Sequence, residues 1–377
     1  MPHFTSTINW VLRVGLARLN QVSPIQEPWV AVIDHSIDIG VKKVFVVLRI
    51  RLSTLKEKGG APQLKDCECI GLQVCEKADH EIVFKQLSDV FERAGKPVAI
   101  IKDQAGNLAK GVKYYNKSIS EKKIATIDDI GHVSANALKS QFEKTRSYKR
   151  FLELINIGSA RLRQTSLAFL LPPKIRTKGR FQSISRLAQW GEKILDILQE
   201  PGRSKEGCLL EKLREGMPGF SRMRPFIERF TATTVVINEV SSILKNQGLN
   251  RSTYQECKDL AETLPARSKV RKRLLEWLKR HLSIHCRLGI KQTPLLVSSD
   301  IVECLFGKFK YINERSPESD INRMALIIPA LCGEPVDQQY VSDVFKNTRH
   351  KDIEKWESEN ISHTLRKKRT AFFKEAG

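Results

Sequence analysis

The stretch Trp29-Val-Ala-Val-Ile-Asp34 decides the fold. Five consecutive apolar residues without helical spacing, ended by an acidic residue, are typical of a short strand that is buried on both faces of a sheet. Such strands occur mainly in α/β proteins, where helices cover both faces. We therefore expect a sheet in the core of this chain, with Asp34 at the end of its first strand.

Four more segments in the first third of the chain have the character of strands, namely residues 44–52, 70–74, 98–101 and 124–127. Gly40 permits the turn of a hairpin between the first two strands. Apolar residues at helical spacing predict a helix over residues 80–94, between the third and fourth strands, and a shorter helix over residues 108–115 follows the fourth. This order predicts an α/β fold with a mixed sheet.

Helical periodicity and charge dominate the rest of the sequence. Residues 1–27 predict an N-terminal helical segment, residues 133–295 a mainly α-helical insertion, and residues 316–377 C-terminal helices with a basic tail. The core is then expected to comprise residues 28–132 and a closing helix within residues 296–315.

The charge points to a polyanionic partner. Sixty-four Lys and Arg against 42 Asp and Glu give a net charge of +22, and such an excess favours binding to a nucleic-acid backbone. No apolar run approaches the roughly 20 residues of a membrane span, so we expect no membrane partner. The eight cysteines are scattered without zinc-ligand spacing, which favours reduced thiols and a cytoplasmic protein.

Three acidic residues lie where a sheet could bring them together. Asp34 ends the first strand, Asp103 follows the fourth, and Glu303 lies on a late helix. Crowded carboxylates repel one another, and a hard cation with oxygen ligands relieves the repulsion. Two such ions can activate the attacking oxygen and stabilise the leaving oxygen of a phosphoryl displacement. Taken singly, an acidic residue after an apolar strand is more often a turn or cap residue.

The helix of Glu303 has a face suited to this chemistry. Ser298 and Ser299 are good N-cap residues, and at 3.6 residues per turn Glu303, Gly307 and Lys310 share one face. A carboxylate and a cation at this spacing could serve a metal ion and a nearby phosphate. The alternative is an ordinary solvated helix face.

Other residues carry weaker signals. Asp129 and His132 follow the fifth strand, where His132 could bond the Asp129 carboxylate or a phosphate; alternatively they are a helix-start aspartate and a structural histidine. Basic segments at 174–180, 269–280 and 366–369 could contact phosphates without reading sequence, or be solvated faces. Trp190 is expected in the core of the insertion, with stacking on a displaced base as the alternative.

Four separated motifs resemble the DDE transposases of bacterial insertion sequences. They are the stretch Trp29-Val-Ala-Val-Ile-Asp-His-Ser-Ile-Asp-Ile-Gly-Val-Lys-Lys, the stretch Lys102-Asp-Gln-Ala-Gly-Asn-Leu-Ala-Lys-Gly, the stretch Asp129-Ile-Gly-His-Val-Ser-Ala-Asn-Ala-Leu-Lys, and the stretch Ser298-Ser-Asp-Ile-Val-Glu-Cys-Leu-Phe-Gly-Lys-Phe-Lys310. The family has a ribonuclease H-like fold, and some members carry a helical insertion before the catalytic glutamate. The resemblance thus implies a ribonuclease H-like mixed sheet interrupted by a helical insertion.

The resemblance also implies an activity. Asp34, Asp103 and Glu303 would hold two Mg²⁺ ions, with Mn²⁺ as a workable substitute, for DNA cleavage at element ends and strand transfer into target DNA. Lys310 would contact a phosphate, and His132 with Asp129 would be an accessory pair. The implied partners are terminal inverted repeats and target DNA, bound by a homodimer or larger assembly in the cytoplasm, at the nucleoid.

Two other functions fit the same residues. A structure-specific endonuclease of the ribonuclease H-like fold would share the carboxylates without joining strands, and a non-catalytic DNA-binding remnant of a transposase would share the charge. Transposases of this kind usually begin with a helix-turn-helix region, whereas fewer than 30 residues precede the first strand here. We expect either that the insertion and tail recognise the element ends or that this is a shortened copy.

Overall fold

The computed structural model describes residues 3–35, 42–120, 123–174, 181, 184–198, 207–290, 292–313, 321–361 and 364–375. The chain divides into two compact units. The first comprises Met1–Asp129, Asn246–Leu249 and Ile284–Gly377, and the second comprises Ile130–Lys245 and Asn250–Ser283. Within the described ranges no helix is long and apolar enough to cross a membrane.

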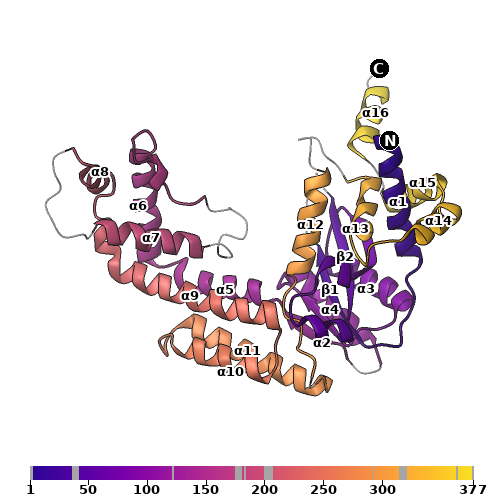
Figure 1. The fold of residues 1–377 in the computed structure, drawn as a ribbon, viewed down its shortest axis with the longest axis horizontal. Helices are drawn as coiled ribbons and strands as arrows, with labels where there is room; N and C mark the ends of the chain where they lie inside the picture. The colour runs from indigo at the N-terminus through magenta and orange to yellow at the C-terminus, as the bar shows by residue number, and fades with distance from the viewer. Residues whose placement is uncertain are drawn as a thin grey trace. The chain divides into compact units, whose positions relative to one another are not determined.

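A five-stranded mixed sheet forms the centre of the first unit (Figure 1). Its strands are β1 (Trp29–His35), β2 (Lys43–Arg51), β3 (Glu68–Cys75), β4 (Ala99–Lys102) and β5 (Ala125–Asp128). They lie in the order β3-β2-β1-β4-β5. β2 is antiparallel to β1 and β3, while β4 is parallel to both β1 and β5. The expected mixed α/β sheet is confirmed, and the expected hairpin turn at Gly40 lies outside the described residues.

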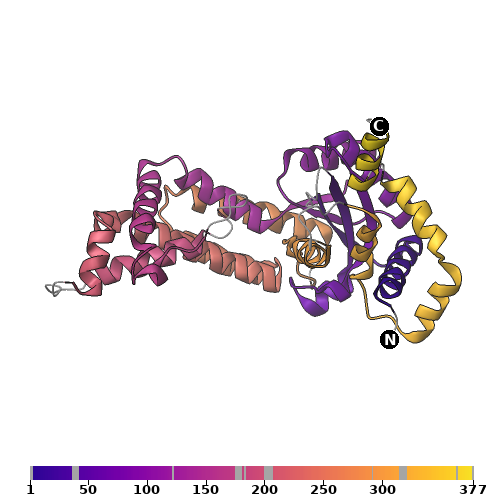
Figure 2. The same cartoon turned by 90° about the horizontal axis from the view of Figure 1, so that it is seen from above.

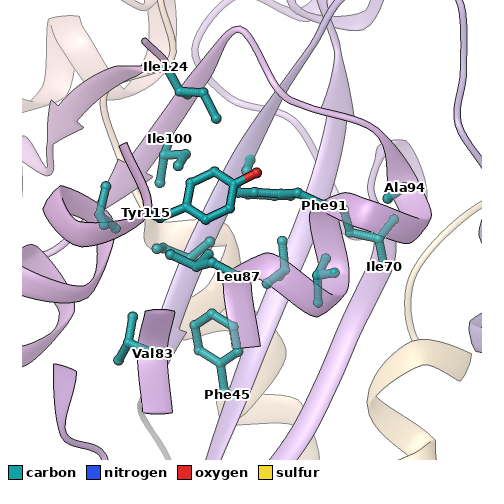
Figure 3. Close-up of a cluster of buried hydrophobic side chains, with 14 of the residues drawn as sticks. Phe45, Ile70, Val83, Leu87, Phe91, Ala94, Ile100, Tyr115 and Ile124 are labelled. Carbon is teal, nitrogen blue, oxygen red and sulfur yellow. The ribbon is translucent and has the colours of Figure 1, made fainter. Parts of the chain in front are cut away.

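One face of the sheet is covered by α3 (His80–Ala94) and α4 (Gly106–Ser118). α3 has the limits that the apolar spacing predicts, and Asp79 caps it by accepting hydrogen bonds from the backbone N–H groups of Glu81 and Ile82. Figure 3 shows the apolar core between these helices and the strands, which includes Ala31, Ile33, Leu87, Phe91 and Tyr115.

The opposite face is covered by α1 (Phe4–Asn20), α12 (Asp300–Asn313) and α13 (Ile327–Ala330), as Figures 1 and 2 show. α12 packs against β1, and α1 and α13 pack against β3. The N-terminal helix is therefore an integral part of the first unit.

Shorter elements complete the first unit. Between β2 and β3 lie α2 (Leu52–Lys58) and the 3-10 helix η1 (Leu64–Asp66), and the C-terminal region adds η5 (Arg323–Leu326), α14 (Gln338–Asn347), α15 (His350–Asn360) and α16 (Leu365–Glu375). Arg13 of α1 donates hydrogen bonds to the backbone carbonyls of Phe345 and Thr348, which fixes α1 to the region of α14.

The second unit is helical in its described residues. Its elements are α5 (Ile130–Phe142), α6 (Arg146–Leu162), η2 (Ala168–Leu170), α7 (Ser185–Leu198), α8 (Leu209–Gly216), η4 (Phe220–Met223), α9 (Arg224–Gln247), α10 (Arg251–Glu262) and α11 (Lys269–Leu288). The last residues of α9, from Asn246, and of α11, from Ile284, belong to the first unit. Aromatic rings form its core, with Phe226 and Phe230 stacked at 5.4 Å between ring centroids and Phe151 tilted against Phe226 at the same centroid distance. Trp190 belongs to this packing, because its ring contacts Phe220 and its Nε1–H donates to the carbonyl of Leu170.

Candidate functional site

Asp34 and Asp103 lie at one end of the sheet, on neighbouring strands. β1 and β4 are parallel, and Val32 is paired with Ile101. Asp34 and Asp103 each follow these partners by two residues, so the continued register brings the two aspartates to the same level. Asp34 is the penultimate residue of β1, and Asp103 directly follows β4. Both side chains are half-buried.

The face on which Asp34 lies follows from strand alternation. Successive side chains of a strand point to opposite faces, and Ala31 and Ile33 belong to the core beneath α3 and α4. Asp34 and Val32 therefore belong to the other face, which α12 covers. His35 returns to the α3 side, where its Nε2 lies 2.9 Å from Oε1 of Gln86.

Glu303 lies on α12, the helix that packs against β1. The buried residues Ile301, Leu305 and Phe309 anchor the helix on the sheet, as their spacing predicts, while Glu303 is exposed. Gly307, one turn further, is also exposed, and a Cβ atom added there would meet nothing within 4 Å. Lys310, at the end of the same stripe, is half-buried.

The start of α12 differs from the expected capping. Both Ser298 and Ser299 were expected as N-cap acceptors, and Ser298 does accept a hydrogen bond from the backbone N–H of Asp300 at 3.2 Å. The Ser299 hydroxyl instead donates to Oδ2 of Asp129 at 3.0 Å, and the Ser299 backbone N–H donates to the same oxygen at 2.7 Å. Asp129 is buried at the end of β5, and a sequence separation of 170 residues gives no local signal of this contact.

A buried ion pair lies next to Asp103. The Lys102 ammonium is 2.8 Å from Oδ1 of Asp128, and the two side chains are only 6% and 10% exposed. Lys102 Nζ also donates to the backbone carbonyl of Asp103 at 3.2 Å. The strand pairing places Lys102 opposite Asp128, which explains why a lysine is tolerated in the last position of a buried strand.

The charge state of His35 is set by its surroundings. Burial lowers the pKa of His35 to about 4, a shift that the hydrogen bond to Gln86 opposes and the nearby Lys43 reinforces. The imidazole is therefore neutral near neutral pH. Its ring lies against Phe45, with 4.4 Å between ring centroids, and this packing fixes the position of His35, the residue that follows Asp34.

These residues are suited to a hard cation. Carboxylate oxygens are the ligands that Mg²⁺ prefers, and Asp34 and Asp103 offer them at one level of the sheet beside the helix of Glu303. In the part of the chain that the structure describes, no three carboxylate, imidazole or thiol side chains are close enough as they stand to hold an ion together. The three carboxylates thus have to draw closer if they share one.

Other predicted functional residues lie on further elements or outside the described residues. His132 lies on α5 in the second unit, and its role stays a prediction. Residues 175–180 of the first basic segment are outside the described residues. Lys367, Lys368 and Arg369 lie exposed on α16, and the Arg366 side chain is not described.

Comparison with known proteins adds one likeness. No protein-family model matches the chain, and no curated protein matches it. Among solved structures, the Drosophila P element transposase strand transfer complex is similar, with 12% identity over 88% of this chain and 84% of that chain and a TM-score of 0.41. The function of this chain has therefore to be judged from its own residues.

Proposed function

We propose that this protein is a DNA transposase whose ribonuclease H-like core uses Asp34, Asp103 and Glu303 to hold divalent metal. The proposal is supported chiefly by the parallel register of β1 and β4, which pairs Val32 with Ile101 and, continued by two residues, leads to Asp34 and Asp103. The carboxylates also lie in the elements in which the DDE transposases of insertion sequences carry theirs: the first strand, the position after the fourth, and a late helix.

The chemistry assigned to the site is phosphodiester transfer. Two Mg²⁺ ions, or Mn²⁺ in their place, supply activation of the attacking oxygen and stabilisation of the leaving oxygen. Asp34 and Asp103 provide oxygen ligands from the sheet, and Glu303 provides them from α12. Water would attack a phosphodiester at the element end, break its P–O3′ bond and free a 3′-hydroxyl. That hydroxyl would then attack a phosphodiester of the target DNA in a second in-line displacement, and the target's own 3′-oxygen would leave as a hydroxyl. Lys310 contacts a phosphate near the reacting bond.

DNA binding is supported by charge and its placement. Lys272 and Lys279 are exposed on α11, about two turns apart on the same side of the helix. Such side chains bind phosphates and contribute affinity without reading sequence. We propose that this face, together with the net charge of +22, holds terminal inverted repeats and target DNA in a homodimer or larger assembly, at the nucleoid of a bacterial cell.

The test is Mg²⁺-dependent cleavage and joining of DNA by the purified full chain. Glu303→Gln keeps the size of the side chain and removes its charge. Glu92→Gln is a matched control, because Glu92 is an exposed glutamate on α3 of the same unit. We expect cleavage and joining by wild type and Glu92→Gln, and DNA binding without either reaction by Glu303→Gln.

Other outcomes decide against the proposal. Cleavage without joining in every substrate indicates a structure-specific endonuclease with the same carboxylates. DNA binding without cleavage by wild type indicates a non-catalytic DNA-binding protein. Equal activity of wild type and Glu303→Gln shows that Glu303 is not a catalytic residue.

A further inference from the structure

Asp129 connects the two elements that carry Asp103 and Glu303. On one side its backbone N–H donates to the carbonyl of Lys102, the residue before Asp103, at 2.9 Å. On the other side its Oδ2 accepts two hydrogen bonds from Ser299, from the backbone N–H at 2.7 Å and from the hydroxyl at 3.0 Å. Asp129 is 2% exposed and Ser299 is 3% exposed, so water does not compete for these bonds.

Ser299 is in turn hydrogen-bonded to the backbone of Glu303. The carbonyl of Ser299 accepts the first hydrogen bonds of α12, from the N–H of Val302 at 2.9 Å and from the N–H of Glu303 at 3.4 Å. The backbone of Glu303 is thus linked through Ser299 and Asp129 to the residue that precedes Asp103. Every link is a hydrogen bond between described residues of the first unit.

We infer that Asp129 is a positioning residue, which holds the first turn of α12 against the end of the sheet and so sets Glu303 relative to Asp103. This inference rests on the proposed function of the three carboxylates. A carboxylate suits the task because hydrogen bonds to a charged acceptor are stronger than those to a neutral one, and because its charge favours the N-terminus of a helix. Residues that orient metal ligands typically contribute 10–100-fold to metal affinity.

Asp129→Asn is the primary variant, since it keeps the shape and removes the charge of the acceptor. Ser299→Ala removes only the hydroxyl donor, and Ser299→Thr restores a hydroxyl. Glu68→Gln is the matched control: Glu68 accepts two hydrogen bonds from the buried Arg49, at 2.9 and 2.6 Å, and lies on β3, two strands from β1. The Glu68→Gln variant weakens a charged contact, between Glu68 and Arg49, that has no link to α12.

Hydrogen exchange of the full chain tests the positioning without any metal. We expect the amides of the first turn of α12, residues 300–303, to exchange at least 10-fold faster in Asp129→Asn and less than that in Ser299→Ala, with Ser299→Thr close to wild type. Glu68→Gln leaves these amides unchanged. Equal exchange of this turn in wild type and Asp129→Asn overturns the inference, whatever the protein does with DNA.

Mn²⁺ binding, followed by the electron paramagnetic resonance of the free ion, tests the consequence for the site. We expect the Mn²⁺ dissociation constant to rise at least 10-fold in Asp129→Asn and to stay unchanged in Glu68→Gln, even where the two variants lose similar stability. If the amides of residues 300–303 exchange faster in Asp129→Asn while the Mn²⁺ affinity is unchanged, Asp129 stabilises α12 without affecting the metal site. This result overturns its role at the site. A wild-type protein that binds no Mn²⁺ contradicts the proposed function itself, and the positioning role at a metal site is lost with it.

Discussion

Asp34 and Asp103 each follow, by two residues, the paired residues Val32 and Ile101 of the parallel strands β1 and β4, although the two aspartates lie far apart in the sequence. Parallel strands end at the same edge of a sheet, so residues at the ends of neighbouring strands lie near each other in the fold even when they are distant in the sequence. The buried run that begins at Trp29 forms the central strand β1 and places Asp34 near the end of that strand. Asp103 follows the neighbouring strand β4 at the same end.

The buried ion pair beside Asp103 predicts a large loss of stability when its cation is removed. Lys102→Met leaves the Asp128 carboxylate buried without the ammonium that neutralises it, and such changes cost about 3–5 kcal/mol. The double variant Lys102→Met/Asp128→Leu is expected to recover most of that loss, because apolar residues can replace a buried pair. Urea denaturation measures both. A loss below about 1 kcal/mol in the single variant contradicts this reading of the pair.

Replacing Gly307 by alanine is expected to have opposite effects on stability and on DNA cleavage. Glycine costs about 1 kcal/mol relative to alanine inside a helix, and a Cβ atom at Gly307 meets no atom of the described residues within 4 Å. Gly307→Ala is therefore expected to raise the melting temperature. If DNA approaches the α12 backbone beside Glu303, the same methyl group lowers the rate of cleavage. Equal cleavage by wild type and Gly307→Ala excludes a close approach at Gly307.

His35 predicts a loss of stability on acidification. Its pKa in the folded chain is about 4 because the ring is buried, against 6.5 for an ordinary histidine. Between these values the unfolded chain binds a proton that the folded chain does not, so stability is full above pH 6.5 and falls as the pH is lowered towards 4, by at most about 1.4 kcal/mol per pH unit. His35→Gln is expected to show a shallower decline in denaturation experiments across this range. Parallel curves for the two proteins contradict the assignment.

The strands and their carboxylates could be predicted from the sequence because each depends on local patterns. A continuous apolar run identifies β1 and the position of Asp34 after it, and the helical spacing of Ile301, Leu305 and Phe309 identifies the buried face of α12 and therefore the exposure of Glu303.

Contacts between distant segments could not be predicted in this way. A serine before a helix is normally read as a cap, yet the Ser299 hydroxyl donates to Asp129, and only the fold brings these residues together. Likewise, Arg13 on the N-terminal helix donates a hydrogen bond to the backbone carbonyl of Phe345. The spacing of apolar residues in the sequence does not predict that contact.

The exposed lysines of α11 predict a change in the salt dependence of DNA binding. Each phosphate contact contributes about 0.9 to the slope of log affinity against log salt, so Lys272→Ala/Lys279→Ala should make that slope shallower by up to about 1.8. Lys346→Ala/Lys355→Ala removes two exposed lysines from α14 and α15 of the other unit and serves as the control. Identical slopes for the two double variants exclude α11 as a specific phosphate-binding face.

The most direct test of the three-carboxylate site is to map the residues around a bound ion. Fe²⁺ substituted for Mg²⁺ generates hydroxyl radicals in the presence of ascorbate and peroxide, and these cut the polypeptide near the ion. We expect cuts close to Asp34, Asp103 and Glu303 in the same sample, suppressed by excess Mg²⁺ and absent in Asp34→Asn. Cuts confined to other segments, or a pattern that Asp34→Asn leaves unchanged, would contradict the three-carboxylate site.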